Sequence, residues 1–508
     1  MKIRKALTAS LASVILAGSC ITPAAVYAND PPLYGDVNLD NFVDVSDAVM
    51  VARFCVMDAG LQITDYGKAC GDVNADSKLD DKDLMKILRF IAKQVTRSEL
   101  GKTDTDEPRQ QRSVSLMEGI EPKLANEKAP DRKFIASQMK LTADLLKAAA
   151  NDPQSAGKNL MISPLSVSQA LAMTANGANG NTKAEMEQLL GDTIDLETLN
   201  RYYAGYTAKL SRSEKVKLNL ANAIWIKDDS RLIQVPEAFL QTTADYYHAD
   251  AYKAPFNDTT AADINGWVYE NTFGMIPELV DDINPDTVMM LVNAVAFEGE
   301  WASPFTLIEE DEPSVFHAYD GDMSADMMRG SGTCYLQDEH ATGFIKRYAG
   351  GYSFAGILPD EDITVSDYLD SMTGESLQAM LDSKDYADVI VTMPKFSDSY
   401  DILMNDMLMK LGMKDAFDPA AADLTGLNAL GNTCIDFVLH KTFIEVNEKG
   451  TKAAAVTGNG TVAGAIRTMP QYITLDRPFL YMILENNTNL PVFIGYVLHP
   501  SAAKTAAE

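Results

Sequence analysis

Two acidic stretches near the start of the chain have the residue types and the spacing of calcium-binding loops. The stretch Gly35–Phe54, GDVNLDNFVDVSDAVMVARF, returns as GDVNADSKLDDKDLMKILRF at Gly71–Phe90, a period of 71 − 35 = 36 residues. Calcium takes about six to eight oxygen ligands, and short carboxylates and amides spaced by two along a tight loop can surround it. We therefore predict one bound Ca²⁺ ion in each stretch.

The candidate ligands occupy positions 1, 3, 5, 7, 9 and 12 of each loop. They are Asp36, Asn38, Asp40, Phe42, Asp44 and Asp47 in the first loop and Asp72, Asn74, Asp76, Lys78, Asp80 and Asp83 in the second. Position 7 contributes its backbone carbonyl, so its side chain is not restricted. Position 6 is Asn41 or Ser77 in place of glycine, and Asn tolerates a left-handed backbone better than Ser. Apolar residues at helical spacing follow each loop, at Ala48–Phe54 and Leu84–Phe90.

A second candidate site is the stretch Glu448–Phe479, EKGTKAAAVTGNGTVAGAIRTMPQYITLDRPF, which is rich in small residues. In an extended chain, Thr451 and every second residue up to Thr457 share one side, and all of them are small and uncharged. The one charge, Lys452, falls on the other side. Burying the first side costs little, because nothing on it is large or charged. We predict a loop that can convert into a strand of a sheet.

The repeated loops and their helices resemble a type I dockerin over about residues 34–95. The resemblance implies a small all-α domain with two EF-hand-like loop–helix repeats, which binds a cohesin module on a scaffolding protein, as in the bacterial cellulosome. In that family, loop positions 10 and 11 help to select the cohesin. They are Val45 and Ser46 in the first repeat and Asp81 and Lys82 in the second. The two pairs differ, which argues against symmetric binding in two orientations.

From about Asp131 to Pro500 the chain resembles the serpins. The matching motifs follow in the family's order: Asn159–Gly191 with its Ser-Pro-x-Ser segment, Asn222–Trp225, Ile264–Trp267, Leu291–Ala294, Phe297–Trp301, Met327–Met328 and Phe493–Gly495. The resemblance implies an α+β domain of three sheets and about nine helices with an exposed reactive-centre loop. It also implies an inhibitor of serine or cysteine proteases rather than an enzyme. In that family, the cleaved loop inserts into the main sheet and takes the bound protease with it.

Family positions carried onto this sequence predict three functional groups of residues. The hinge of the loop is Glu448, Gly450, Thr451, Ala453, Ala454 and Ala455. The "shutter", a polar cluster under the main sheet, is Ser163, Ser166, Asn293 and His440, and the "breach", where the hinge enters the sheet, is marked by Trp301. The plainer alternatives are a satisfied buried polar network for the four shutter residues and a large core side chain for Trp301.

Two positions compete for the bait bond that the protease cuts. Counting forward from Glu448 by the family's usual length places it at Gly464–Ala465, within the small-residue window Ala463, Gly464, Ala465 and Ile466. Counting back from Asp476–Phe479 places it at Arg467–Thr468, because the loop is 467 − 464 = 3 residues longer than typical. The first window suits a subtilisin- or elastase-like protease and Arg467 a trypsin-like one. The small-residue window is favoured, and Arg467 stays open.

The remaining segments predict an exported protein. Residues 1–28 have the basic start, apolar run and Val-Tyr-Ala end of a secretory signal, and the run is too short for a good membrane span. A weak lipoprotein box at Leu16–Cys20 is a minority alternative. Residues 96–130 are polar and predict a flexible linker, which leaves 131–501 for a monomeric serpin domain. Cys55 and Cys70 could pair as a disulfide outside the cell or remain thiols.

Charge and motif content weigh against other functions. A net charge of −29 argues against nucleic acid or an anionic membrane as a partner, and a hydrophobic content of 46% supports a folded core. Dockerins usually carry carbohydrate-degrading enzymes, so a glycosidase is one alternative. Gly351–Ala355 nearly forms the nucleophile elbow of a serine hydrolase, but the run continues as a buried strand. The closest alternative is a non-inhibitory serpin, against which the small hinge residues argue.

Overall fold

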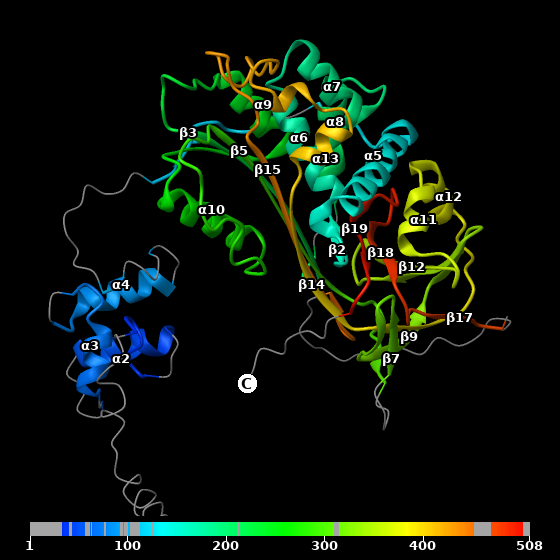
Figure 1. Ribbon diagram of the computed structural model, residues 1–508, viewed down its shortest axis with the longest axis horizontal. Coiled ribbons are helices and arrows are strands. Elements are labelled where there is room, and N and C mark those ends of the chain that lie inside the picture. Colours follow the sequence, from blue (N-terminus) through cyan, green and yellow to red (C-terminus); the bar gives the residue numbers. More distant parts are fainter. Residues whose placement is uncertain are drawn as a thin grey trace, which may run out of the picture. The chain divides into compact units, whose positions relative to one another are not determined.

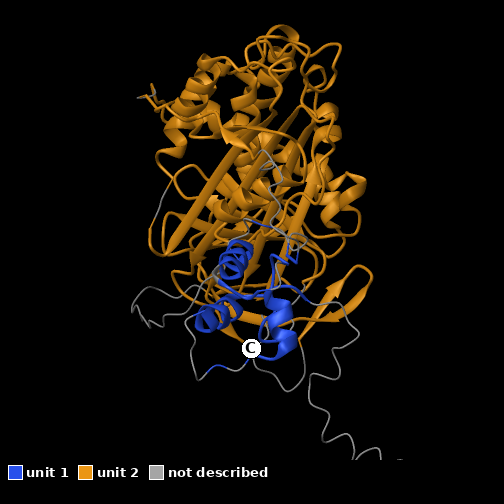
Figure 2. Ribbon diagram, turned by 90° about the vertical axis from the view of Figure 1, so that its left-hand side faces the viewer, with its two compact units in different colours: residues 1–111 blue, residues 112–508 orange. Residues whose placement is uncertain are grey.

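The computed structural model describes residues 33–39, 43–55, 61, 63–75, 78–91, 95, 100–101, 112–123, 126–210, 213–308, 314–451 and 469–500. They belong to two compact units, residues 1–111 and 112–508 (Figure 2). Several predicted features lie outside the described residues: the signal segment 1–28, part of the linker, the candidate ligands Asp40, Phe42 and Asp76, the hinge residues Ala453, Ala454 and Ala455, and the bait window 463–468.

Unit 1 contains three helices among its described residues, α2 (Val45–Cys55), α3 (Asp65–Gly71) and α4 (Asp81–Ile91). Helices α2 and α4 follow the two repeated loops as predicted, and α3 is an additional short helix between the repeats. Val37 and Val73, and likewise Val51 and Ile87, are core residues 36 positions apart. The sequence repeat is therefore also a repeat in packing.

Unit 2 has an α+β fold with nine α-helices among its described residues. They are α5 (Arg132–Ala150), α6 (Pro164–Ala175), α7 (Gly180–Gly191), α8 (Leu196–Thr207), α9 (Glu237–Tyr247), α10 (Asp258–Asn271), α11 (Val365–Ser371), α12 (Gly374–Asp382) and α13 (Asn405–Lys410), with 3-10 helices at Pro153–Ser155 and Asp415–Phe417. With the three helices of unit 1, the described chain has twelve α-helices. About nine helices were predicted for the second domain alone, and the described residues of unit 2 have nine α-helices. None of the described helices is long and apolar enough to cross a membrane.

Three larger sheets and a small ribbon make up the β-structure of unit 2. The main sheet has the order β1 (Val114–Ser115), β4 (Asp250–Ala254), β3 (Val216–Lys227), β5 (Met289–Glu300), β16 (Gly450–Thr451), β15 (Phe437–Val446) and β14 (Phe396–Leu403). A six-stranded sheet has the order β10 (Cys334–Gln337), β11 (Ala341–Arg347), β12 (Tyr352–Pro359), β18 (Phe479–Glu485), β19 (Pro491–Val497) and β2 (Leu160–Ile162). A four-stranded sheet has the order β17 (Gln471–Thr474), β13 (Val389–Pro394), β9 (Met327–Gly332) and β6 (Thr306–Leu307), and the ribbon joins β7 (Val315–Ala318) to β8 (Gly321–Ser324).

The central strand β5 is covered on both faces. Its residues Met290, Val292 and Ala294 pack in one cluster with Ile264 and Trp267 of α10. The alternate residues of β5, among them the leucine and phenylalanine at 291 and 297, belong to the larger cluster on the other face. Figure 1 shows α10 on one side of the main sheet and α6 and α8 on the other. A strand added beside β5 would therefore be covered on both faces.

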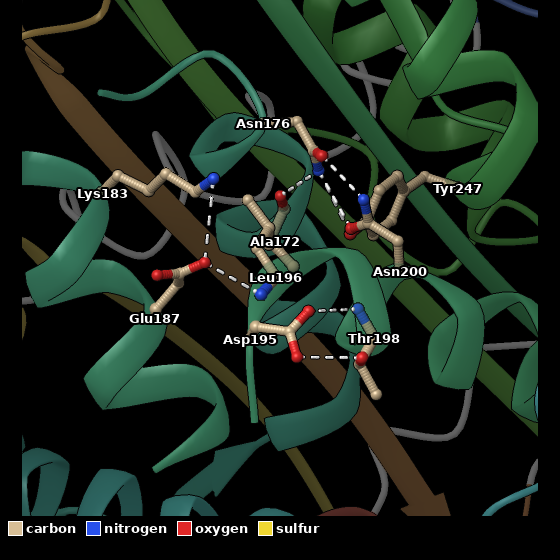
Figure 3. Close-up of polar contacts among 9 residues, drawn as sticks. All are labelled: Ala172, Asn176, Lys183, Glu187, Asp195, Leu196, Thr198, Asn200 and Tyr247. Atoms are coloured by element: carbon tan, nitrogen blue, oxygen red, sulfur yellow. Dashed lines mark hydrogen bonds and ion pairs between the residues drawn. The ribbon is translucent and has the colours of Figure 1, made fainter. Parts of the chain in front are cut away.

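A buried amide network ties α6, α8 and α9 together (Figure 3). Asn200 donates through Nδ2 to Asn176 Oδ1 at 2.7 Å, and Asn176 donates through Nδ2 to Asn200 Oδ1 at 3.0 Å and to the Ala172 carbonyl at 2.8 Å. The Tyr247 hydroxyl donates to Asn200 Oδ1. The two amides donate to and accept from each other, so they link the helices of the layer to which α6 belongs.

The start of unit 2 differs from the predicted linker at residues 96–130. Val114 and Ser115 form β1, which pairs antiparallel with β4 at the edge of the main sheet. The Leu116 amide donates to the Ala251 carbonyl at 2.7 Å, and the Ser113 amide donates to Asp263 Oδ2 at 2.9 Å. Polar composition concealed this strand, because edge pairing uses backbone groups that every residue except proline supplies in full. Unit 2 therefore begins at residue 112 and not at 131.

Candidate functional site

A tight turn joins β15 to β16 where the predicted hinge begins. Asn447 Oδ1 accepts the amides of Lys449 at 2.9 Å and Gly450 at 3.2 Å, and the Asn447 amide donates to the Gly450 carbonyl at 2.9 Å. A Cβ atom at Gly450 would lie 2.1 Å from the carbonyl oxygen of Gly299. Only glycine fits so close an approach of two backbones, which is the physical reason for the residue at this hinge position.

Strand β16 lies between β5 and β15. Gly450 and Thr451 pair antiparallel with Glu300 and Gly299 of β5, and Thr451 also pairs with Val446 of β15. The last described residues of the hinge, Gly450 and Thr451, are thus already a short strand within the main sheet.

Strands β5 and β15 are separated by β16 at the end of the main sheet where the hinge begins. At the other end of the sheet, β5 and β15 pair with each other directly. Thr451 is 2% exposed, and its hydroxyl lies 2.6 Å from the Tyr348 hydroxyl. Farther along, β5 and β15 pair directly and in parallel over five residues each, ending at Ala294 and Lys441. The place at which the two strands separate is therefore the place at which β16 begins to fill the gap.

Trp301, predicted to mark the breach, contacts the hinge directly. Its amide donates to the Lys449 carbonyl at 2.9 Å and its Nε1 donates to the Asn447 carbonyl at 2.9 Å. Its ring stacks on Tyr348, with the centroids 4.3 Å apart. The neighbouring Glu448 carboxylate lies 3.3 Å from Lys395 Nζ. A side chain that only filled the core would not need two hydrogen bonds to the hinge, so these contacts favour the predicted role of Trp301. The family motifs did not identify its partners Asn447 and Tyr348, or Lys395.

A buried lysine lies beside Trp301, and the sequence did not single it out. Lys346 of β11 is 1% exposed, and its Nζ donates to the Ser331 carbonyl at 3.0 Å. The same nitrogen lies 4.1 Å from the ring centroid of Phe305 and 5.7 Å from that of Trp301. Burial lowers the pKa of Lys346 to about 8. Strand alternation does not mark this lysine, because residues on both sides of β11 are buried from Gly343 to Lys346.

The four predicted shutter residues form one hydrogen-bonded cluster where α6, β5 and β15 meet. The Ser163 amide donates to His440 Nε2 at 3.0 Å, and the Ser166 amide donates to Ser163 Oγ at 3.3 Å. His440 Nδ1 lies 2.6 Å from Asn293 Oδ1, and Asn293 Nδ2 donates to Ser166 Oγ at 2.5 Å. All four residues are buried.

The protonation of His440 follows from these partners. Because the Ser163 amide donates to Nε2, the proton must reside on Nδ1, which donates to Asn293. Burial lowers the pKa of His440 to about 3, so the ring is neutral at physiological pH. Asn293 donates also to Asn222 Oδ1 at 2.5 Å, a fifth member that sequence reasoning missed although it begins a recognised motif. Asn293 and His440 are register partners, so the cluster spans the joint between β5 and β15.

The two acidic loops of unit 1 share one geometry. In the first, Asp47 Oδ1 accepts the amides of Val37 at 2.7 Å and Asn38 at 3.1 Å, and Oδ2 accepts the Asp44 amide at 2.9 Å. In the second, Asp83 Oδ1 accepts the amides of Val73 at 3.0 Å and Asn74 at 3.3 Å, and Oδ2 accepts the Asp80 amide at 2.9 Å. Position 4 of both loops, Leu39 and Ala75, has a left-handed backbone. The same strained conformation on two unrelated side chains shows that the loop imposes it.

The carboxylates at position 12 are buried among like charges. Burial raises the pKa of Asp47, and it raises the pKa of Asp83 to about 6, helped by the charges of Asp72 and Asp80. A carboxylate has about four acceptor sites, and backbone amides take three of them here. No three Asp, Glu, His or Cys side chains of the described residues converge as a metal site, but Asp40 and Asp76 at position 5 are not among these residues. The donors present are the hard oxygen atoms that calcium prefers.

The four candidate cohesin-binding residues begin the two helices. Val45 and Ser46 open α2, Asp81 and Lys82 open α4, and Val45 is exposed. The Ser46 amide donates to Asp44 Oδ1 at 2.7 Å, and the Lys82 amide donates to Asp80 Oδ1 at 2.9 Å. Val49 on α2 and Met85 on α4, which are 36 positions apart, are also exposed, as is Leu88. Each helix thus presents apolar side chains outward as well as inward.

The structure bears on two features that the sequence left open, the possible disulfide between Cys55 and Cys70 and the near match to a nucleophile elbow. Cys55 is exposed and Cys70 is buried, and no disulfide joins the described cysteines. Ser353, from the near match to a nucleophile elbow, lies within the buried strand β12, where its hydroxyl donates to Asn486 Oδ1 at 2.7 Å. Ser353 is therefore a buried, hydrogen-bonded residue of a strand and not the exposed serine of a nucleophile elbow.

Comparisons with known proteins match both units. The model of the Serpin (serine protease inhibitor) family matches residues 136–500, and that of the Dockerin type I domain matches residues 34–92. Serpin B9 of Homo sapiens is 31% identical over 368 residues, which are 70% of this chain and 96% of that protein. The crystal structure of the thermophilic serpin tengpin in its native state is 41% identical, with a TM-score of 0.71 over 77% of this chain and 100% of that chain. Tengpin in its latent state is 39% identical, with a TM-score of 0.64 over 74% of this chain and 100% of that chain.

Proposed function

Because the chain belongs to the serpin family and carries an N-terminal type I dockerin domain, we propose that it is a secreted, scaffold-anchored suicide inhibitor of serine proteases. Its reactive loop is the bait, and the cut loop traps the acyl-enzyme by entering the main sheet. The observation that carries the proposal is the position of Gly450 and Thr451, which form a strand between β5 and β15.

The register of β16 gives the path of insertion. Gly450 pairs with Glu300 and Thr451 with Gly299, so each further residue would pair one step back along β5. Continued in this way, Thr457 would reach Asn293 in the shutter, and Thr461 would reach Met289, the first residue of β5. The bait window from Ala463 to Thr468 would begin just beyond that strand. A cut within the window would therefore leave enough chain to fill the whole gap.

Alternation along the same strand explains the small hinge residues. The Thr451 side chain is buried beside Tyr348, and Ala453 and Ala455 would point to the same side. That side faces a packed interior, where small uncharged residues enter at little cost. Inserting about a dozen residues adds roughly a dozen backbone hydrogen bonds at a net ~0.5–1.5 kcal/mol each, on the order of 10 kcal/mol. A misplacement of about 1 Å in the acyl-enzyme is enough to stop its hydrolysis.

The shutter would control how readily the gap opens. Insertion requires the direct pairs between β5 and β15 to separate, and the bond from His440 to Asn293 crosses that joint. Ser163 and Ser166 at the start of α6 hold the same two side chains from below the sheet. We assign these four residues, with Asn222, to holding the intact inhibitor closed.

The dockerin domain would bind calcium and attach the inhibitor to a cohesin. In each loop the side chains at positions 1, 3, 5, 9 and 12 and the carbonyl of position 7 would hold one Ca²⁺ ion. The ion would offset the like charges that help to raise the pKa of Asp83. Val45, Ser46, Asp81 and Lys82 would meet the cohesin, with the exposed Val49 and Met85 extending an apolar contact. The anchored inhibitor would protect a cellulosome from extracellular proteases.

One experiment tests inhibition and identifies the bait bond. The full chain is mixed with subtilisin, elastase or trypsin, and a denaturant-resistant adduct is sought by gel and by mass. The mass of the released fragment distinguishes Gly464–Ala465, which suits the first two proteases, from Arg467–Thr468. Intact and cut chains are then melted side by side, and insertion predicts a higher Tm for the cut chain. Cleavage without an adduct and without a Tm change would instead identify a non-inhibitory serpin.

A further inference from the structure

The three most exposed large apolar side chains of the described residues are close to the end of the reactive loop. Met469, Tyr386 and Tyr472 are 88%, 75% and 71% exposed. Met469 is the first described residue after the loop, and Tyr472 lies on β17, the edge strand of the four-stranded sheet (Figure 1). We call these three residues the exit patch. Single exposed apolar residues are ordinary on a protein surface, but a group of them marks a site of interaction.

Strand pairing brings the three residues of the exit patch to one place. Strands β13 and β17 run parallel, with Val389 opposite Gln471 and Ile390 opposite Tyr472. Tyr386 precedes Val389 by three residues and Met469 precedes Gln471 by two, so both lie at the same end of this strand pair. The Gln471 amide donates to the carbonyl of residue 388 at 2.8 Å, which keeps the two incoming segments together.

The chemistry around the exit patch is that of a protein interface. Tyr472 adjoins Ile390 on the same face of the sheet, and Arg329 of β9 is exposed two register steps away, where its Nε donates to Thr392 Oγ1 at 3.3 Å. Tyr, Met and Arg are the residue types enriched at protein interfaces. Tyrosine supplies a large contact area and loses little side-chain entropy when it is bound.

We propose that the exit patch is a docking surface for the target protease, outside the protease's own active-site cleft. The inference rests on the proposed inhibitory function. A fully extended chain spans at most about 3.6 Å per residue, so Tyr472 lies no more than about 18 Å from the Arg467–Thr468 bond and about 29 Å from Gly464–Ala465. A protease–inhibitor interface covers about 800 Å² on each partner, a disc about 30 Å across. A disc of that size reaches about 15 Å from its centre, so a protease seated on Arg467–Thr468 covers Met469 and has its rim near Tyr472. A protease seated on Gly464–Ala465 has its rim near Met469, beside the two tyrosines.

The rate of inhibition tests this docking surface. The double variant Tyr386→Ser/Tyr472→Ser leaves Met469 and the bait residues intact, so the sequence read by the protease cleft does not change. We expect its second-order rate of association with subtilisin to fall about tenfold, as for the loss of about 1.4 kcal/mol of contact energy. The number of inhibitor molecules consumed per protease should not change, because neither tyrosine takes part in insertion.

A matched control is Tyr269→Ser. Tyr269 is 39% exposed and belongs to α10, and Figure 1 shows α10 and β17 on opposite sides of unit 2. The association rate of this variant should equal that of the unaltered protein. An unchanged rate in the double variant would overturn the docking surface, and so would an equal loss in the control. If sedimentation shows a dimer that the double variant loses while the rate is unchanged, the patch binds a second copy of the chain and the proposal is wrong. If the unaltered protein forms no adduct with any protease tested, the inhibitory function itself fails, and the docking surface fails with it.

Discussion

His440 and Lys346 are basic side chains that unit 2 buries almost completely, one in the cluster predicted to be the shutter and one beside Trp301. Burial disfavours the charged form of each, so both pKa values are lowered. The consequences differ because the unfolded pKa values differ. Histidine becomes charged in the unfolded chain below about pH 6.5, and lysine loses its charge there only above about pH 10.4.

Acid should weaken the fold through His440. Its folded pKa of about 3 lies below the unfolded value, so the unfolded chain binds more protons as the pH falls from about 6.5 towards 3. Stability that is present above pH 6.5 is then lost by up to ~1.4 kcal/mol per pH unit. Denaturant unfolding between pH 7 and pH 4 measures this slope. His440→Gln, which cannot titrate, should start less stable at pH 7 and show a shallower slope, and an equal slope in both proteins would exclude His440 as the cause.

Replacing Lys346 should stabilise the protein. The amine of Lys346 is charged at pH 7, so its burial costs stability there. Between about pH 8 and pH 10.4 the unfolded chain holds more protons than the folded one, so the stability of the native protein rises with pH. Lys346→Met should be more stable by about 2–3 kcal/mol at pH 7, with the difference shrinking by pH 10. Arg347→Met, at the exposed next position, is the control and should show little of this pH dependence.

At the scale of elements, β16 is the feature on which the proposed mechanism depends. It has only two residues, yet it occupies the gap between β5 and β15 at the end where they separate. A two-residue strand contributes little to stability by itself. Its importance is that it would set the register and the direction of the loop residues after Thr451 if they entered the sheet.

Changing the hinge should block insertion and spare the fold. Thr451 is buried between two strands beside Tyr348, and an arginine there could not enter the sheet without burying its charge. Thr451→Arg should therefore be cut by the protease without forming a stable adduct, while its intact Tm changes little because β16 is so short. Thr451→Ser keeps the hydroxyl and is the control. An adduct formed by the arginine variant would contradict insertion through β16.

At the scale of the whole molecule, the two units have separate cores, and they should respond separately to calcium. The core of unit 1 is built from residues of the two repeats, and those of unit 2 from the sheets and their helices. Each unit therefore has a core of its own that can respond to a change in conditions.

Chelation should separate the two activities. With EGTA present, the like charges in the loops of unit 1 are not offset, so cohesin binding and the helical signal of an isolated unit 1 should both fall. Added Ca²⁺ should restore both. Adduct formation with the protease, measured on the same full-length sample, should be unchanged. A loss of inhibition on chelation, or cohesin binding that survives it, would show that calcium has a different role.

The sequence alone determined the features that depend on short-range spacing. The 36-residue repeat, the acidic loops, the small residues from Thr451 onward and the ordered family motifs all lie within short windows of chain, so they could be recognised before any fold was known. The two-domain plan and the family followed from them. The predicted helices after each loop follow for the same reason, because helical periodicity is local.

Only the tertiary structure decided the rest, because it depends on which distant segments pair. Trp301 meets Asn447 across 146 residues and Asn293 meets Asn222 across 71, and no local pattern encodes either contact. Strand β1 was hidden in a polar segment, since backbone pairing at a sheet edge does not require apolar side chains. Lys346 looks like any surface lysine until the strands around it bury it. The register between remote strands depends on the whole chain. That register sets the direction in which the hinge enters the main sheet and leaves the gap between β5 and β15 that the hinge begins to fill.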